Sequence, residues 1–196
     1  MLKTLRYVYA LLFFIYPLLC RDVLVEFKTA YFLPTDSCVR AIYGKGGALY
    51  GPEATFQLCE NDNWYGFASV DFLSKKGHSV GLCEPTKMYI APLALGVKYF
   101  VPFCYGDFYA GLGFQALHLK TVNCSSHVAQ ITSKWGFGGI AKIGAYCELP
   151  CNYFVDLFFD YSFAKVGCDK CSTSTVPLKV SMNGAIFGIG LGYRFN

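Results

Sequence analysis

The sequence predicts an all-β fold, an eight-stranded antiparallel up-and-down transmembrane β-barrel. Three observations predict it: the composition is strongly apolar, hydropathy alternates with period two in eight segments, and the connections between these segments alternate between long and short. Hydrophobic residues make up 54% of the chain and charged residues only 15%, with a mean hydropathy of +0.36. A water-exposed surface usually carries more charge, so we expect strands that present one face to lipid.

The N-terminal segment is predicted to be a signal peptide. A basic head, "MLKTLR", precedes the apolar run "YVYALLFFIYPLLC", which is the pattern of a secretory signal. The run is too short, and too interrupted by Pro17, to span a membrane as a helix. Cleavage after Cys20 leaves residues 21–196 as the barrel domain. A lipoprotein with an acylated Cys20 is less favoured, because Leu19 stands where a small residue is expected.

Strand alternation is clearest in Tyr153–Phe163. Leu157 and Phe159 lie on its apolar face, whereas Asp156 and Asp160 lie on the other. Period two over this length is typical of a membrane-crossing strand. The other seven strands are predicted at Val23–Leu33, Ala48–Leu58, Trp64–Leu73, Met88–Tyr99, Phe108–Leu117, Phe137–Cys147 and Gly184–Asn196. Pro52 and Pro92 fall inside predicted strands, where they cannot donate to a ladder, and so indicate bulges or shifted boundaries.

The connections alternate in length along the chain. Polar connections of 13 or more residues are predicted at 34–47, 74–86, 120–134 and 167–179, whereas those at 59–63, 101–106 and 148–152 are short. Hairpins in a soluble sandwich have no reason to follow this rule. A membrane barrel with short periplasmic turns and longer external loops does.

The orientation of the two faces follows from the width of the barrel. The interior of an eight-stranded barrel only just holds its own side chains, so we expect the bulky apolar face to meet lipid. The glycine-rich face, with charges of both signs, is predicted to point inward, where opposite charges neutralise one another. The predicted lumen charge network is Glu26, Lys28, Glu53, Asp71, Lys98, Lys142, Asp156, Asp160 and Arg194.

The C-terminal strand resembles an assembly signal of outer-membrane barrels. Its pattern is a glycine, an aromatic three residues later and a final aromatic, here Gly190, Tyr193 and Phe195. The chain departs from the usual pattern at Asn196, because the aromatic residue is normally last.

The signal peptide, the eight strands and this ending together resemble the small outer-membrane barrels of the OmpA, OmpX and OmpW type. The segments "FKTAYFLPTDSCVRAIYGKGG", "FLSKKGHS" and "PLALGVKYF" further resemble outer-membrane barrel proteins of chlamydia-like bacteria. The resemblance implies a location in the bacterial outer membrane. It also implies membrane lipid and the barrel-assembly machinery as partners, and it implies neither a reaction nor a cofactor.

Ten cysteines are present, and nine of them follow the predicted cleavage site. Exported cysteines are expected to oxidise, and an odd number leaves at least one for another chain. We therefore predict disulfide cross-linking to other cysteine-rich envelope proteins, with local bridges at each end of the barrel as the alternative. The candidate disulfide residues are Cys38, Cys59, Cys83, Cys104, Cys124, Cys147, Cys151, Cys168 and Cys171.

Metal binding and catalysis are not predicted. Cys124, His127, Cys168 and Cys171 have the spacing of a zinc site, but disulfide formation is favoured outside the cell. The histidines lie beside serines in two places, which is not in itself a catalytic geometry. The net charge of +4 is spread along the chain, so nucleic-acid binding is not expected.

The leading prediction for function is a structural or surface-interaction barrel in the outer membrane. One alternative is a narrow conduit for small hydrophobic solutes. Another is a soluble secreted β-barrel that encloses an apolar ligand, which would require the apolar face to point inward.

Overall fold

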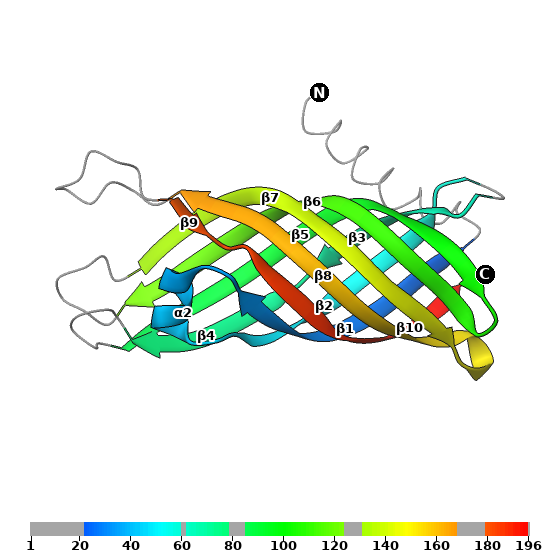
Figure 1. The fold of residues 1–196 in the computed structure, drawn as a ribbon, viewed down its shortest axis with the longest axis horizontal. Helices are drawn as coiled ribbons and strands as arrows, with labels where there is room; N and C mark the ends of the chain where they lie inside the picture. The colour runs from blue at the N-terminus through cyan, green and yellow to red at the C-terminus, as the bar shows by residue number, and fades with distance from the viewer. Residues whose placement is uncertain (1–21, 60–61, 79–84, 124–130, 168–178, 196) are drawn as a thin grey trace, which may run out of the picture.

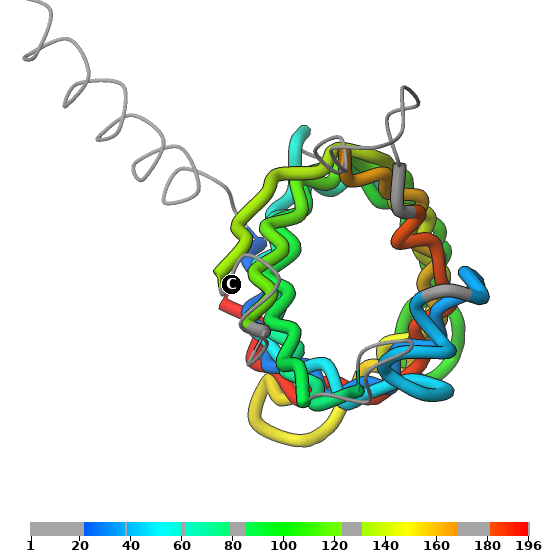
Figure 2. Tube along the Cα trace, turned by 90° about the vertical axis from the view of Figure 1, so that its left-hand side faces the viewer, coloured from blue at the N-terminus to red at the C-terminus, as the bar shows by residue number. Residues whose placement is uncertain are grey.

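The computed structural model describes residues 22–59, 62–78, 85–123, 131–167 and 179–195. The predicted signal peptide lies outside these residues. The strands run along a single closed wall, seen from the side in Figure 1 and nearly end-on in Figure 2. Their bounds are β1 (Val23–Pro34), β2 (Gly47–Gln57), β3 (Trp64–Val70), β4 (Phe72–His78), β5 (Pro85–Phe103), β6 (Gly106–Asn123), β7 (Ile131–Glu148), β8 (Tyr153–Gly167), β9 (Lys179–Ser181) and β10 (Gly184–Phe195).

The wall is a ring of eight antiparallel strands. β1 pairs with β2 on one side and with β10 on the other, which closes the barrel. β3 and β4 lie end to end between β2 and β5, and β9 and β10 lie end to end beside β8, so ten segments make eight ring strands. The predicted fold class is confirmed.

The break between β3 and β4 lies at Asp71, which is opposite Pro92 of β5 and next to Val70, the residue opposite Pro52 of β2. The Asp71 N–H donates to the carbonyl oxygen of Pro92, 3.0 Å away, and Pro52 cannot donate because it has no N–H. The pairs Tyr50–Phe72 and Glu53–Ser69 are separated by equal lengths of β2 and of the β3–β4 strand. No residue is inserted, so the predicted bulge is wrong and the prolines mark a local interruption of the ladder.

Several strands extend further than predicted. β5, β6 and β7 contain 19, 18 and 18 residues. β4 and β5 include seven of the 13 residues predicted as a loop at 74–86, and β6 and β7 include eight of the 15 at 120–134. Outside a membrane both faces of a strand can be polar, so hydropathy alternation ends before the pairing does. We call the end with these extended strands the loop end. The opposite end, with the short connections and the C-terminus, is the turn end (Figure 1).

Two short helices occur in the connections that the structure describes. α2 (Ser37–Tyr43) lies in the first predicted loop. Its first turn is held by a hydrogen bond from the Val39 N–H to the Asp36 carboxylate (3.3 Å), and it ends at Gly44, which has a φ of 79°. The 3₁₀ helix η2 (Pro150–Asn152) forms the turn between β7 and β8. Among the described residues, no helix is both long and apolar enough to cross a membrane.

The outward face of the wall is apolar and is bounded by aromatic residues at each end. At the turn end, the rings of Trp64 and Tyr99 lie 5.0 Å apart. Along β8, Tyr153 and Phe163 both face outward and are ten residues apart. At about 3.3 Å per residue and a tilt of about 40°, this distance crosses about 25 Å, the height of the apolar band of membrane barrels. The wall between the two aromatic belts is therefore the membrane-spanning surface.

Candidate functional site

The lumen is filled by three layers of side chains rather than by glycines and charges alone. Aromatic side chains fill the turn end, charged side chains fill the middle, and aliphatic side chains fill the loop end. The aromatic layer is Tyr65, Phe100, Tyr109, Tyr146 and Phe154; the mainly aliphatic layer includes Leu49, Leu73, Ile90 and Leu117, together with Phe32. The predicted inward face of glycines and opposite charges thus describes only the middle of the lumen. There Gly96 and Gly113 leave room for the ring of Phe67.

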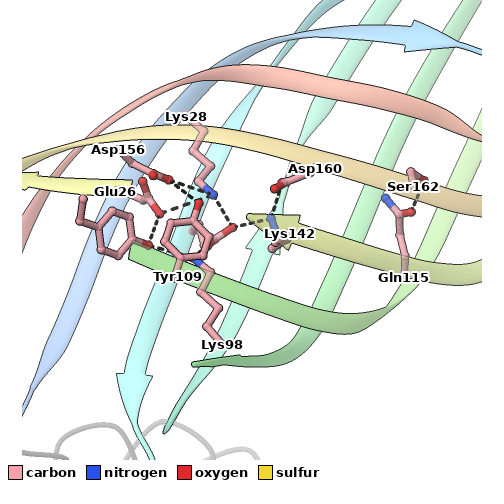
Figure 3. Close-up of polar contacts among 11 residues, drawn as sticks. Glu26, Lys28, Lys98, Tyr109, Gln115, Lys142, Asp156, Asp160 and Ser162 are labelled. Atoms are coloured by element: carbon pink, nitrogen blue, oxygen red, sulfur yellow. Dashed lines mark hydrogen bonds and ion pairs between the residues drawn. The ribbon is translucent and has the colours of Figure 1, made fainter. Parts of the chain in front are cut away.

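Glu53 is the centre of the charged layer. Figure 3 labels the three lysines that surround it, Lys28, Lys98 and Lys142. The Glu53 carboxylate accepts hydrogen bonds from Lys28 (2.9 Å), from Lys142 (3.1 Å) and from Lys98. Lys142 also donates to Asp160 over 2.7 Å. Residues from β1, β2, β5, β7 and β8 therefore meet at one point on the barrel axis.

Two further carboxylates share the ammonium of Lys28. Its Nζ lies 3.5 Å from Glu26 and 3.6 Å from Asp156. The hydroxyl of Tyr146 donates to Glu26 (3.0 Å), and that of Tyr109 donates to Asp156 (2.9 Å). These tyrosines link the charged layer to the aromatic layer below it.

The structure brings together seven of the nine predicted lumen charges: Glu26, Lys28, Glu53, Lys98, Lys142, Asp156 and Asp160, all buried. Asp71 lies at the break in the wall and forms no ion pair with a described residue. Arg194 lies at the turn end instead, where it pairs with Asp107 (3.0 Å) and Glu148 (2.5 Å).

The sequence-based prediction missed the polar uncharged members of the lumen. Tyr109 and Tyr146 join the network, and Ser162 donates to Gln115 over 2.5 Å one layer further toward the loop end. All four occupy inward positions of predicted strands, so the period-two pattern alone placed them beside the charges. The pattern did not indicate that the hydroxyl groups of Tyr109 and Tyr146 would donate hydrogen bonds to the buried carboxylates, although a buried tyrosine usually needs such an acceptor.

A cavity of about 210 Å³ opens at the turn end beside Tyr146, Phe154 and Arg194. Toward the loop end, the described side chains leave little free space along the barrel axis. A cavity of about 20 Å³ lies among Phe32, Leu49, Ile90, Leu117 and Ile186. A single water needs about 10–15 Å³, so this cavity has no room for a solute. The charged layer is suited to holding five wall strands in register.

The other predicted sites lie at the two ends or outside the described residues. Cys59, Cys104, Cys147 and Cys151 are unpaired and lie at the turn end. Cys83, Cys124, Cys168, Cys171 and His127 are outside the described residues, as is the side chain of Cys38. No group of three or more metal-ligating side chains occurs in the part of the chain that the structure describes. His118 contacts Ser133 (2.8 Å) and the ring of Trp135.

The residues of the predicted assembly signal all lie in β10. Gly190 faces the lumen, beside Glu26. Tyr193 packs edge-on against Phe195, at 4.8 Å between ring centroids, and against Tyr153 of β8.

Comparison with known proteins identifies the fold. No protein-family profile matches this chain, and no curated protein is detectably similar to it. Solved structures are similar at low identity. Outer membrane protein W of Escherichia coli is 15% identical, with a TM-score of 0.58, covering 90% of this chain and 98% of that one. The attachment invasion locus protein Ail of Yersinia pestis is 14% identical, with a TM-score of 0.56, covering 89% and 98%.

A third similar structure is the outer membrane protein AlkL, at 14% identity and a TM-score of 0.52, covering 90% of this chain and 91% of that one. The apolar outward face excludes the soluble barrel with an apolar interior. The fold and the membrane-spanning band agree with the predicted location in a bacterial outer membrane. This chain has the fold of the small eight-stranded outer-membrane β-barrels.

Proposed function

We propose that this protein is an outer-membrane anchor with a structural and surface-interaction role. The observation that carries the proposal is the combination of a filled lumen with a sheet that projects from the loop end. The filled lumen weighs against the alternative of a conduit for small hydrophobic solutes through the barrel axis. The projecting sheet provides a surface outside the membrane.

The projecting sheet consists of the outer parts of β4, β5, β6 and β7. Pairing of β7 with β8 begins at Gly136, whereas β7 itself starts at Ile131. The residues Ile131–Ser133 pair with β6 on one side and with no described strand on the other. The opposite edge, in β4, is covered by α2, since Gly77 lies directly against the backbone of Ile42. An uncovered strand edge can accept an extended segment of another protein.

A structural neighbour supports the same role. The similar barrel of Yersinia pestis is described as an attachment invasion locus protein and was solved in complex with a heparin analogue. A barrel with this fold can therefore bind a molecule outside the membrane.

Shortening the β6–β7 hairpin tests the surface role. Because Lys120 and Ser133 are directly paired, residues 121–132 can be replaced by an Asn-Gly turn without altering the wall below. Cells that display the shortened barrel are expected to adhere to immobilised extracellular-matrix protein roughly threefold less than cells with the full barrel, if β-strand addition contributes the contact. A control substitution at the turn end, Tyr105→Ala, should leave adhesion unchanged. Equal adhesion of the shortened and full barrels, at equal surface levels, would contradict a surface-interaction role.

Disulfide cross-linking to cysteine-rich envelope proteins belongs to the same proposal. The resemblance to barrels of chlamydia-like bacteria motivates it, and the exposed thiols of Cys59, Cys104 and Cys151 support it. They lie at the turn end, which faces the periplasm in barrels of this type. Free exported thiols at one end are well placed to pair with another chain.

Non-reducing gels of intact envelopes test this cross-linking. We expect slow-migrating species that collapse to the monomer with reductant and disappear in the triple variant C59S/C104S/C151S. The single variant Cys147→Ser, at a less exposed thiol of the same end, should retain them. A sharp monomer band from wild-type envelopes without reductant would rule the cross-links out.

Assembly by the outer-membrane barrel machinery is likewise proposed, from the C-terminal pattern. Tyr193 and Phe195 lie on the last strand of the wall, and their rings contact each other and Tyr153. Strand β10 also closes the ring by pairing with β1. A recognition signal on β10 would therefore lie on the strand that closes the barrel.

A further inference from the structure

Four lysines face outward at the loop end of the wall, one on each of four strands. They are Lys76 on β4, Lys87 on β5, Lys120 on β6 and Lys165 on β8, and all four side chains are exposed. The residues next to each along its strand point inward or are less exposed, as the strand period requires. We call these four residues the outer lysine belt.

Each lysine of the outer lysine belt lies twelve residues along its wall strand from an exposed aromatic residue at the turn end. The pairs are Trp64 and Lys76, Tyr99 and Lys87, Phe108 and Lys120, and Tyr153 and Lys165. Ten residues cross the apolar band, so twelve place the lysine about 5 Å beyond it, at the depth of the lipid headgroups. The belt therefore has a common depth, set by equal strand lengths.

The belt brings like charges together. Lys76 and Lys87 are direct cross-strand partners, and Lys120 is paired with Tyr89, which places it diagonally from Lys87. Like charges opposite one another destabilise a sheet. Within the described strands no outward acid offsets them, because β4 and β5 contain neither Asp nor Glu and both acids of β8 are buried in the lumen. The belt forms no ion pair with a described residue.

A bound anion would stabilise the belt by offsetting these charges, and the position of the belt favours one source. The lysines stand on the outer surface of the wall, next to the outer aromatic belt formed by residues such as Tyr89 and Phe163. Lys165 lies on β8, outside the projecting sheet, so the belt follows the wall rather than that sheet alone. Lysine side chains at this depth extend along the wall and hold the ammonium at the headgroup level. We propose that the outer lysine belt binds the phosphate groups of lipids in the outer leaflet.

Lipid selectivity at the barrel surface tests this inference. The barrel is refolded into phosphatidylcholine vesicles, and its association with spin-labelled phosphatidylglycerol is measured relative to spin-labelled phosphatidylcholine. A preference of roughly three- to tenfold for the anionic lipid is expected, since each lysine near a charged headgroup contributes modestly and the contributions add. The variant K76Q/K87Q should lose most of it, and K76R/K87R should keep it.

A matched control separates the belt from general surface charge. R40Q/K45Q removes the same two charges from the connection between β1 and β2, and it should leave the selectivity unchanged. Heat-modifiable migration confirms folding in each sample. Absence of a preference in the wild type, or equal losses in the two glutamine variants, would overturn the proposal. It would also be overturned if K76Q/K87Q reduced retention on immobilised heparin while lipid selectivity stayed the same, because the belt would then bind a soluble polyanion.

Discussion

Replacing Glu53 with glutamine is expected to lower the free energy of unfolding by about 3–5 kcal/mol, the range for breaking a buried ion pair. Among the described residues, Glu53 is the only carboxylate paired with Lys98, whose side chain is fully buried. In the variant Lys98 would have no carboxylate partner, only the neutral amide, the hydroxyl of Tyr146 (2.8 Å) and the rings of Phe67, Tyr109 and Tyr146. Urea unfolding in vesicles, followed by gel migration and tryptophan fluorescence, measures the loss.

Glu26→Gln is the matched control for this prediction. It removes the same charge from the same buried layer, but Lys28 retains Glu53 and Asp156 as partners. Its expected cost is about 1 kcal/mol, that of weakening one hydrogen-bonded contact. If the two variants were equally destabilised, net charge in the layer rather than local pairing would control stability.

A double variant completes the test. Adding Lys98→Met to Glu53→Gln removes the ammonium that the single change leaves without a carboxylate. Because an apolar side chain of similar length needs no ionic partner, part of the lost stability should return. An additive loss in the double variant would mean that Lys98 does not depend on Glu53.

The sequence alone predicted the ring of eight strands and which face of each strand points inward, and β8 shows why. Asp156 and Asp160 alternate with Leu157 and Phe159, as in a strand with one polar and one apolar face. In the structure the two aspartates lie in the lumen, and Leu157 and Phe159 lie on the outer surface. Arg194 follows the same alternation yet does not join the network. Strand parity determines which face a residue occupies but not its height along the barrel axis.

The extended strands and the interior layers were harder to predict for a different reason. Residues 120–123 of β6 and 131–134 of β7 show no regular alternation of hydropathy, because a strand outside the membrane can be polar on both faces. These ends of the two strands were therefore predicted as part of a loop. In the lumen, Phe32 and Leu117 point inward, although the bulky apolar face of each strand was expected to point outward. A filled barrel without a water channel can bury apolar groups on both faces, and near the loop end this one does.

Replacing Leu157 with lysine is expected to cost about 2–4 kcal/mol of unfolding free energy in vesicles, as charge does at the bilayer midplane of a barrel. Leu157 faces outward on β8 between the aromatic belts. The control is Phe163→Lys on the same strand and face, with 52% exposure against 53% for Leu157. Phe163 lies at the interface, where lysine costs about 0–1 kcal/mol. Burial within the protein is equal at the two sites, and Phe163 also loses its ring contact with Tyr161. A larger loss at Leu157 would therefore come from its depth in lipid. Equal costs would mean that this face meets water along its whole length, and the membrane-spanning band would have to be placed elsewhere.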